Sequence, residues 1–151
     1  MAAHSSTVSE LEIEEQLTAF LRRGYRVQMP QQAGGVRLDR AAYGTMCKLA
    51  DDGPQHLAAL AKAFGLDPST ITRQVKSLEA AGLAVRSKDV YDRRVVVLDL
   101  TDRGRDVLER ARADRRERLQ KVLADWSAAD LEDLGRLMEE FNDSMSRLRD
   151  Y

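Results

Sequence analysis

The chain has 151 residues, of which 43% are hydrophobic and 32% charged, and its formal net charge is −1. This length fits one domain or one domain with an extension, and the apolar content excludes a largely disordered chain. The charge is unevenly distributed, because residues 54–105 hold nine Lys/Arg and six Asp/Glu, a balance of +3. The middle of the chain is therefore its basic part, although the total charge gives no sign of a nucleic-acid partner.

Several classes of protein are excluded by what the sequence lacks. Cys47 is its only cysteine, which excludes an internal disulfide or a cysteine-rich zinc site and favours a reducing compartment. No apolar run approaches the roughly 20 residues of a membrane helix, and the first residues do not have the form of a signal peptide. There is no glycine-rich phosphate loop, metal-spaced His/Cys set or nucleophile–base pair. We therefore expect a cytoplasmic protein, not an enzyme, with no metal, no cofactor and no membrane partner.

The first half of the chain predicts four helices. Asp39 is the expected N-cap of the second helix, and Gly65 ends the third. Asp67 followed by Pro68 is typical of the N-cap and first turn of the fourth helix, which stops at Gly82. The segment "PQQAGG" after the first helix is interpreted as a loop. The helices are expected over residues 8–29, 40–50, 57–64 and 68–81.

The second half predicts two strands and two long helices. "LAVRS" and "VVVLDL" are strand candidates, and in the second of them Val96, Leu98 and Leu100 share one face at period two. Thr101 is the expected N-cap of a highly charged helix that reaches about Asp125, and "SAAD" resembles a capping motif before the last helix. The expected fold class is mainly α with a small two-stranded β hairpin.

A helix-turn-helix pattern lies in the middle of the chain. Ala61, Gly65 and Ile71 are separated by four and then six residues. The small residue lets two helices cross closely, the glycine permits the turn, and the branched residue anchors the second helix. Gln74 stands where this pattern usually has an aliphatic residue, and we expect it at the edge of the core.

The second helix of this pair has an outer face suited to DNA. No acidic residue occurs from Ser69 to Ser77. Arginine can bind guanine edges in a major groove, hydroxyls and lysine can bind phosphates, and Pro68 leaves the helix N-terminus open to a phosphate. An ordinary solvated helix face is the alternative. The candidate DNA-binding residues on this helix are Ser69, Thr70, Thr72, Arg73, Lys76 and Ser77.

The hairpin that follows has the position of a wing beside the helix pair, and its connection contains "VYDRR". Arg93 and Arg94 are candidates for the DNA backbone and the narrow minor groove, whose negative potential favours arginine. Asp92 is unfavourable near phosphates, so we interpret it as an intramolecular partner that holds one arginine in position. A hairpin with solvated charged tips is the alternative.

The segment "DRRVVVLDLTDRG" has the form Asp-x-Arg, five residues, Leu-Thr, two residues, Gly. It resembles the wing signature of the MarR family of bacterial transcriptional regulators, and the resemblance extends to the element order over nearly the whole chain. It implies a winged helix-turn-helix, a homodimer and a palindromic operator in double-stranded DNA. It also implies that Arg94 enters the minor groove and pairs with Asp92, while Arg93 lies closer to phosphate.

The terminal helices are expected to form the dimer. The apolar residues of the last helix are spaced by 3, 4, 3, 4 and 3, a heptad-like stripe that needs a partner. We divide the chain into a winged helix-turn-helix region, residues 38–101, and dimerisation helices, residues 1–30 and 102–151. Packing of these helices on their own chain only is the alternative, and Trp126 is interpreted as core. The candidate dimerisation residues are Leu11, Leu17, Leu131, Leu134, Met138, Phe141, Met145 and Leu148.

The resemblance further implies a sequence-specific repressor released by a small aromatic or phenolic ligand. Arg22, Arg23 and Arg26 of the first helix could bind the carboxylate of a ligand, but arginines on a helix surface usually contact only solvent. No effector-binding residues are therefore assigned. Cys47 is interpreted as an inert core residue, and an oxidant-responsive regulator acting through it is the alternative. A second alternative is a helical interaction module without specific DNA binding.

Overall fold

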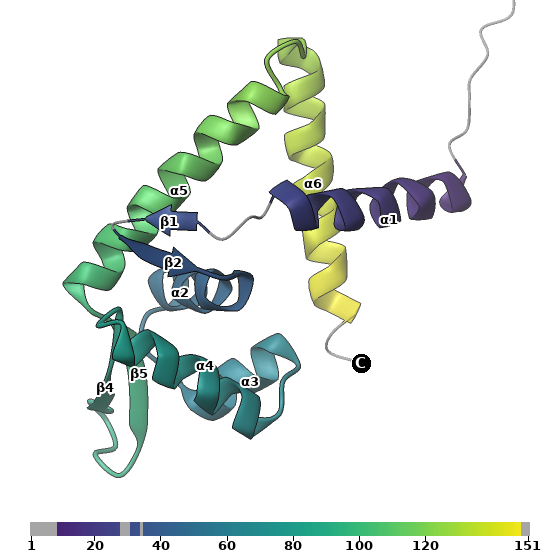
Figure 1. The fold of residues 1–151 in the computed structure, drawn as a ribbon. Coiled ribbons are helices and arrows are strands. Elements are labelled where there is room, and N and C mark those ends of the chain that lie inside the picture. Colours follow the sequence, from purple (N-terminus) through teal and green to yellow (C-terminus); the bar gives the residue numbers. More distant parts are fainter. Residues whose placement is uncertain (1–8, 28–30, 34, 149–151) are drawn as a thin grey trace, which may run out of the picture. The chain divides into compact units, whose positions relative to one another are not determined.

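The structure is a computed structural model that describes residues 9–27, 31–33 and 35–148. It divides into two compact units, Met1–Ala111 and Arg112–Tyr151, each taken by itself below. Figure 1 shows their helices and strands. Within the described ranges, every helix is too short or too polar to cross a membrane.

The first unit contains the predicted helix-turn-helix and hairpin, together with three short strands that were not predicted. Its elements are α1 (Glu10–Val27), β1 (Gln31–Ala33), β2 (Val36–Leu38), α2 (Arg40–Asp52), β3 (Gln55–His56), α3 (Leu57–Phe64), α4 (Pro68–Ala80), β4 (Ala84–Lys88), β5 (Val96–Leu100) and the first half of α5 (Asp102–Val122).

The predicted starts of α2 and α5 are confirmed by their caps. Oδ1 of Asp39 accepts a hydrogen bond from the N–H of Ala42 at 2.7 Å, which fixes the start of α2. Oγ1 of Thr101 accepts the N–H of Gly104 at 2.9 Å at the start of α5. Gly65 ends α3 in the left-handed conformation, with φ 63°, which a glycine adopts without strain.

The sheet has three strands, whereas the sequence predicted a two-stranded hairpin. In it β5 is central, with β4 and β3 antiparallel on either side, and Leu98 pairs with Arg86 of β4 and Gln55 of β3. Because β3 has only two residues and its partner lies far along the chain, no periodic pattern identifies it. The extra strand joins the hairpin to the start of α3.

A second difference lies before α2, where a loop was expected. The segment contains a short antiparallel hairpin in which β1 pairs with β2, from Gln31 opposite Leu38 to Ala33 opposite Val36. Gly35 has φ 76° at its turn. Pro30 and residue 34 of the expected loop are outside the described residues, as are Val8 and Met29 at the ends of the expected first helix.

The hydrophobic core of the first unit lies between α2, α3, α4 and the sheet (Figure 1). In β5 the buried residues are Val97, Leu98 and Leu100, whereas Val96 is exposed. Both faces of β5 therefore carry buried residues, Val97 on one face and Leu98 with Leu100 on the other. Residues of early α5, namely Val107, Leu108 and Ala111, also belong to this core.

The second unit consists of the rest of α5 and of α6 (Ala128–Leu148). α5 ends at Val122, three residues earlier than expected, and Oγ of Ser127 accepts the N–H of Asp130 at 3.1 Å to start α6. Trp126 is 47% exposed, so its interpretation as a core residue was wrong for the single chain. Two helices and a short junction do not enclose so large a ring.

Candidate nucleic-acid interface

The helix-turn-helix consists of α3, a turn at Gly65 and α4. Ala61 is buried where the two helices meet, and its carbonyl oxygen accepts the N–H of Leu66 at 2.9 Å. Ile71 is buried on the second helix, together with Val75 and Leu78. Gln74 is half-buried, as expected for a position at the edge of the core. The apolar side of α4 is thereby fixed against the core, and its polar side faces outward.

The N-terminus of α4 is capped by the preceding residue. Oδ1 of Asp67 accepts hydrogen bonds from the N–H groups of Ser69 and Thr70, both at 2.9 Å. Pro68 has no N–H, and the N–H of Ile71 donates to the carbonyl oxygen of Asp67 at 3.2 Å. The expectation of an open phosphate site at this helix end does not hold, because the chain satisfies these donors itself.

The carboxylate of Asp67 also accepts hydrogen bonds from two side chains. Oγ of Ser69 donates to Oδ1, and Oγ1 of Thr70 donates to Oδ2 at 2.6 Å. These bonds, first that from the Ser69 hydroxyl, hold the pKa of Asp67 well below its usual range. A fully ionised carboxylate therefore stands at the start of α4, where the helix dipole stabilises negative charge.

All four candidate hydroxyl groups of α4 donate hydrogen bonds inside the chain. The acceptors are the Asp67 carboxylate for Ser69 and Thr70, the Pro68 carbonyl for Thr72 at 2.6 Å, and the Arg73 carbonyl for Ser77 at 3.3 Å. A hydroxyl has a single proton, so while these bonds persist the groups offer only lone pairs to a partner. The expected donation to a phosphate would require these bonds to break.

Two cations of α4 face outward. Arg73 and Lys76 are both exposed, and neither charged group forms an ion pair within the described residues. They are one turn apart on the side of α4 opposite the buried residues. The charge available to a partner on this helix therefore comes from these two side chains.

The hairpin of β4 and β5 extends beside α4 as a wing (Figure 1). An ion pair of 3.1 Å between Arg86 Nε and Glu79 Oε1 connects β4 to α4. A second ion pair of 3.0 Å between Arg105 and Asp99 connects α5 to β5. Both pairs are partly solvated, so they contribute more to the positions of these elements than to their stability.

Asp92 acts on the main chain of the wing. Its Oδ1 accepts the N–H of Arg94 at 3.0 Å, and its carbonyl oxygen accepts the N–H of Val95 at 2.9 Å. Within the described residues, the side chains of Arg93 and Arg94 form no ion pair with it, and both are exposed. The expected contact with an arginine is therefore made to the backbone of Arg94 rather than to its guanidinium.

Asp89, which was not predicted as a site residue, organises the same loop. Its Oδ1 accepts the N–H groups of Tyr91 at 2.7 Å and Asp92 at 3.0 Å. These bonds, first that from Asp92, lower the pKa of Asp89 from its ordinary value, and the nearby His56 adds to the effect. An aspartate at the start of a short connection between two strands is a usual signal of such a turn and would have identified it.

The Leu-Thr-x-x-Gly half of the wing signature is structural. Oγ1 of Thr101 donates to the Gly82 carbonyl at 2.7 Å, and the N–H of Thr101 donates to the Leu83 carbonyl at 3.1 Å. Gly104 is buried against the backbone of Leu83. These contacts attach the start of α5 to the turn between α4 and β4, which sets the base of the wing.

The candidates for sensing are less well defined. Cys47 is half-buried against the core, as is Tyr43 one turn before it on α2. Arg22 and Arg23 are exposed on α1, and the side chain of Arg26 is outside the described residues. In the described part of the chain, no three His, Cys, Asp or Glu side chains are grouped so as to hold a metal.

Fold and site together define a winged helix-turn-helix protein. The MarR family model matches residues 38–96. The chain is 35% identical over 130 residues to the uncharacterized HTH-type transcriptional regulator YxaD of Bacillus subtilis, covering 86% of this chain and 90% of that one. It is 36% identical over 101 residues to the HTH-type transcriptional repressor NicR of Pseudomonas putida, covering 65% and 64%.

A solved structure agrees with this fold. The FabT protein of Streptococcus pneumoniae, which was crystallised in complex with DNA, has a TM-score of 0.75 at 18% identity, covering 93% of this chain and 99% of that chain. The chain belongs to the MarR family. It is a DNA-binding transcriptional regulator and not an enzyme.

Proposed function

We propose that this regulator is a homodimeric repressor that binds a palindromic operator and is released by a small aromatic or phenolic ligand. Repression is supported by the relative NicR, which is named a transcriptional repressor. The ligand class follows from the family resemblance of the wing signature and the element order.

The dimer is supported by the exposed apolar stripe of α6, which is the observation that carries the proposal. No residue of α6 is buried in the single chain, and Leu134 is half-buried. Exposed apolar side chains at helical spacing indicate a partner helix. On α1, Leu11 and Leu17 are exposed in the same way. The exposed members of the α6 stripe are Leu131, Met138, Phe141, Met145 and Leu148.

The dimer would give two copies of α4 a twofold relation, which is what a palindromic operator requires. We assign residues 38–101 to the winged helix-turn-helix region that carries the DNA-binding residues, and residues 1–30 and 102–151 to dimerisation. In each copy α4 enters the major groove, with Arg73 reading base edges and Lys76 binding phosphate. On the wing, Arg94 enters the minor groove and Arg93 binds phosphate, with Asp92 shaping the backbone that carries them.

The proposal is tested by fluorescence anisotropy on DNA from upstream of the regulator's own gene, with random DNA as the control, at near-physiological salt. We expect selective binding that saturates at one dimer per site and weakens steeply as salt is raised. Aromatic acids are then added to the complex, and release of the DNA identifies the effector class. Weak, salt-insensitive binding would instead favour a helical interaction module.

The same assay distinguishes release by a small ligand from release by oxidation of Cys47. A Cys47→Ser variant that still loses DNA on oxidation, or wild-type protein that keeps its DNA, excludes the thiol as the sensor. The half-buried position of Cys47 against the core gives no specific support to that alternative.

A further inference from the structure

The most exposed large hydrophobic side chains among the described residues lie at the tip of the wing. Val90 is 90% and Tyr91 98% exposed, and both lie in the segment that joins β4 to β5. Most other exposed apolar residues lie on α1, α5 and α6, where the proposed dimer would cover them. The dimer proposal does not account for the two residues at the wing tip.

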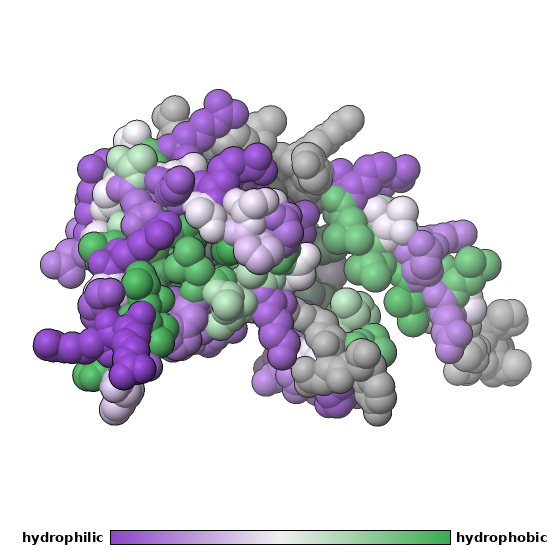
Figure 2. Space-filling model, turned by 90° about the horizontal axis from the view of Figure 1, so that it is seen from below, coloured by the Kyte–Doolittle hydropathy of each residue, from purple (hydrophilic) through white to green (hydrophobic). Residues whose placement is uncertain are grey.

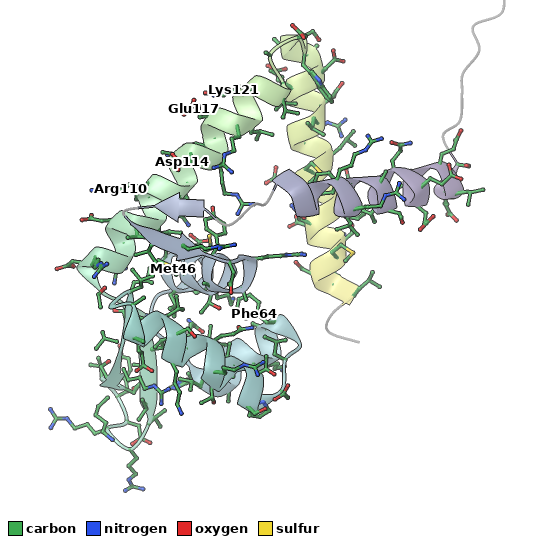
Figure 3. All side chains as sticks on the ribbon, in the orientation of Figure 1. Met46, Phe64, Arg110, Asp114, Glu117 and Lys121 are labelled. Carbon is green, nitrogen blue, oxygen red and sulfur yellow. The ribbon has the colours of Figure 1, made fainter. Side chains whose placement is uncertain are left out.

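The main chain around these residues is held in a defined shape. The N–H of Asp89 donates to the Val95 carbonyl at 2.9 Å and closes the loop. Inside the loop, Oδ1 of Asp89 accepts the N–H of Tyr91 at 2.7 Å, and Asp92 accepts the N–H of Arg94 at 3.0 Å. Figure 3 shows side chains at this end of the hairpin extending away from the rest of the unit. A loop with this internal bonding loses little conformational entropy when it binds.

The wing presents positive charge on both sides of its apolar tip. Lys88 precedes the two apolar residues, and Arg93 and Arg94 follow them, all exposed. The carboxylates of the two acids in the loop accept hydrogen bonds from N–H groups of the loop's own main chain. Figure 2 views the molecule from below, the side toward which the wing extends in Figure 1, and shows hydrophobic groups set among hydrophilic ones. A partner for this tip must combine apolar surface with closely spaced negative charge.

The minor groove of DNA has this combination, because its walls of deoxyribose lie between two rows of phosphates. The Arg86–Glu79 ion pair connects the wing to α4, so the tip belongs to the same compact unit as the helix-turn-helix. We propose that Tyr91 is a DNA-contacting residue of the wing, whose ring packs on deoxyribose beside the minor-groove arginine. This inference rests on the proposed function, since it requires the wing to reach DNA.

The first test compares Tyr91→Ala, Tyr91→Phe and Val85→Ala on a random duplex of about 30 base pairs, long enough for two half-sites. Every nucleotide of DNA has a deoxyribose, so the proposed contact can form on a duplex of any sequence. Tyr91→Ala should weaken binding by about 5- to 10-fold, the effect of removing part of the ring's apolar surface from water. The salt dependence should not change, because no charge is removed. Tyr91→Phe and the control Val85→Ala, an exposed apolar residue of β4, should keep the affinity.

The second test reports on the ring directly. Trp126 is the only tryptophan of the chain, so a Tyr91→Trp, Trp126→Phe double variant has one fluorophore at the wing tip. Addition of DNA should quench its emission and shift it to shorter wavelength. Unchanged emission on saturating DNA would show that the ring stays in solvent.

The outcomes separate this inference from the proposed function. Full affinity in Tyr91→Ala, while Arg94→Ala still weakens binding, overturns the role of Tyr91 and leaves the proposed function standing. Wild-type protein that binds neither random nor upstream DNA overturns both. A Trp reporter that responds to phosphatidylglycerol vesicles and not to DNA assigns the tip to a membrane surface, and also overturns the inference.

Discussion

The backbones of Gly104 and Leu83 lie in direct contact. A Cβ on Gly104 would lie 2.0 Å from the carbonyl oxygen of Leu83 and 2.9 Å from its carbonyl carbon. The same carbonyl oxygen accepts the N–H of Thr101 at 3.1 Å. The first turn of α5 thus rests on the segment that leads from α4 into β4, with no side chain between them.

Gly104→Ala should destabilise the protein by about 1–3 kcal/mol, because backbone atoms must shift to admit the methyl group. The urea midpoint of unfolding measures this. Gly44→Ala on α2 is the matched control, since its Cβ would lie 3.8 Å from the ring of Phe64, an ordinary contact. Alanine favours a helix over glycine by about 0.5–1 kcal/mol, so this control should be neutral or stabilising. Equal losses in both variants would contradict the explanation.

Asp67→Asn should remove a pH-dependent part of the stability. The folded-state pKa of Asp67 is lowered, so its contribution is present above the ordinary aspartate pKa of about 4 and is lost as pH falls through the folded-state value. Wild type should therefore exceed Asp67→Asn in urea midpoint near pH 7, and the difference should shrink below about pH 4. A difference that stays constant with pH would assign the effect to packing.

Arg94→Ala should weaken operator binding by about tenfold while leaving the dimer folded. Lys121→Ala removes the same charge from α5, outside the proposed DNA-binding region, where Lys121 pairs with Glu117 at 2.7 Å (Figure 3). This control should bind as wild type does at matched salt. If both variants weaken binding equally, the arginine contributes net charge only and has no minor-groove contact.

Arg73→Ala should reduce the discrimination between operator and random DNA. A guanine contact is specific, so affinity for the operator should fall by about 1–3 kcal/mol more than affinity for random DNA. Lys76→Ala should lower both affinities by similar factors, as a phosphate contact does. Competition titrations with both duplexes measure the ratio, and an unchanged ratio in Arg73→Ala makes it a phosphate contact too.

Phe141→Glu should dissociate the dimer, because it adds a charge to the apolar stripe of α6. Asn142→Glu is the control, since it adds the same charge at the next position, off the stripe. Sedimentation velocity at micromolar concentration should give a monomer for the first variant and a dimer for the second. Removal of residues 131–151 should also abolish the dimer, and a dimeric fragment would contradict the proposed role of α6.

Much of the fold follows from local signals in the sequence. The cap residues Asp39, Asp67 and Thr101 fix the starts of three helices, since each has a short side chain that reaches the backbone two or three residues later. The helical spacing of apolar residues predicts which face of each helix is buried. The family resemblance adds the winged helix-turn-helix, because its motif combines the wing with the start of α5.

The parts that were not predicted depend on partners distant in sequence or on hydrogen bonds of individual atoms. The strand Gln55–His56 exists only because it pairs with β5, and polar residues of such a short strand carry no pattern. Asp92 was correctly associated with Arg94, but residue type alone does not tell whether a carboxylate binds a guanidinium or a backbone N–H. Trp126 was misassigned because its burial depends on which residues pack around the junction of α5 and α6, and the local sequence does not show this.

The hydroxyl groups of α4 limit what this helix can read. Each hydroxyl donates a hydrogen bond to an acceptor within the chain. While these bonds persist, each can accept from a nucleobase amino group but does not donate to the oxygens of a phosphate. In the major groove those amino groups belong to adenine and cytosine, whereas guanine and thymine present acceptors or a methyl group. Selection from a randomised DNA library should therefore enrich adenine or cytosine at the base pairs that contact these hydroxyls, and guanine at the base pair that contacts Arg73. The hydrogen bonds within the chain would set this base preference in the free protein.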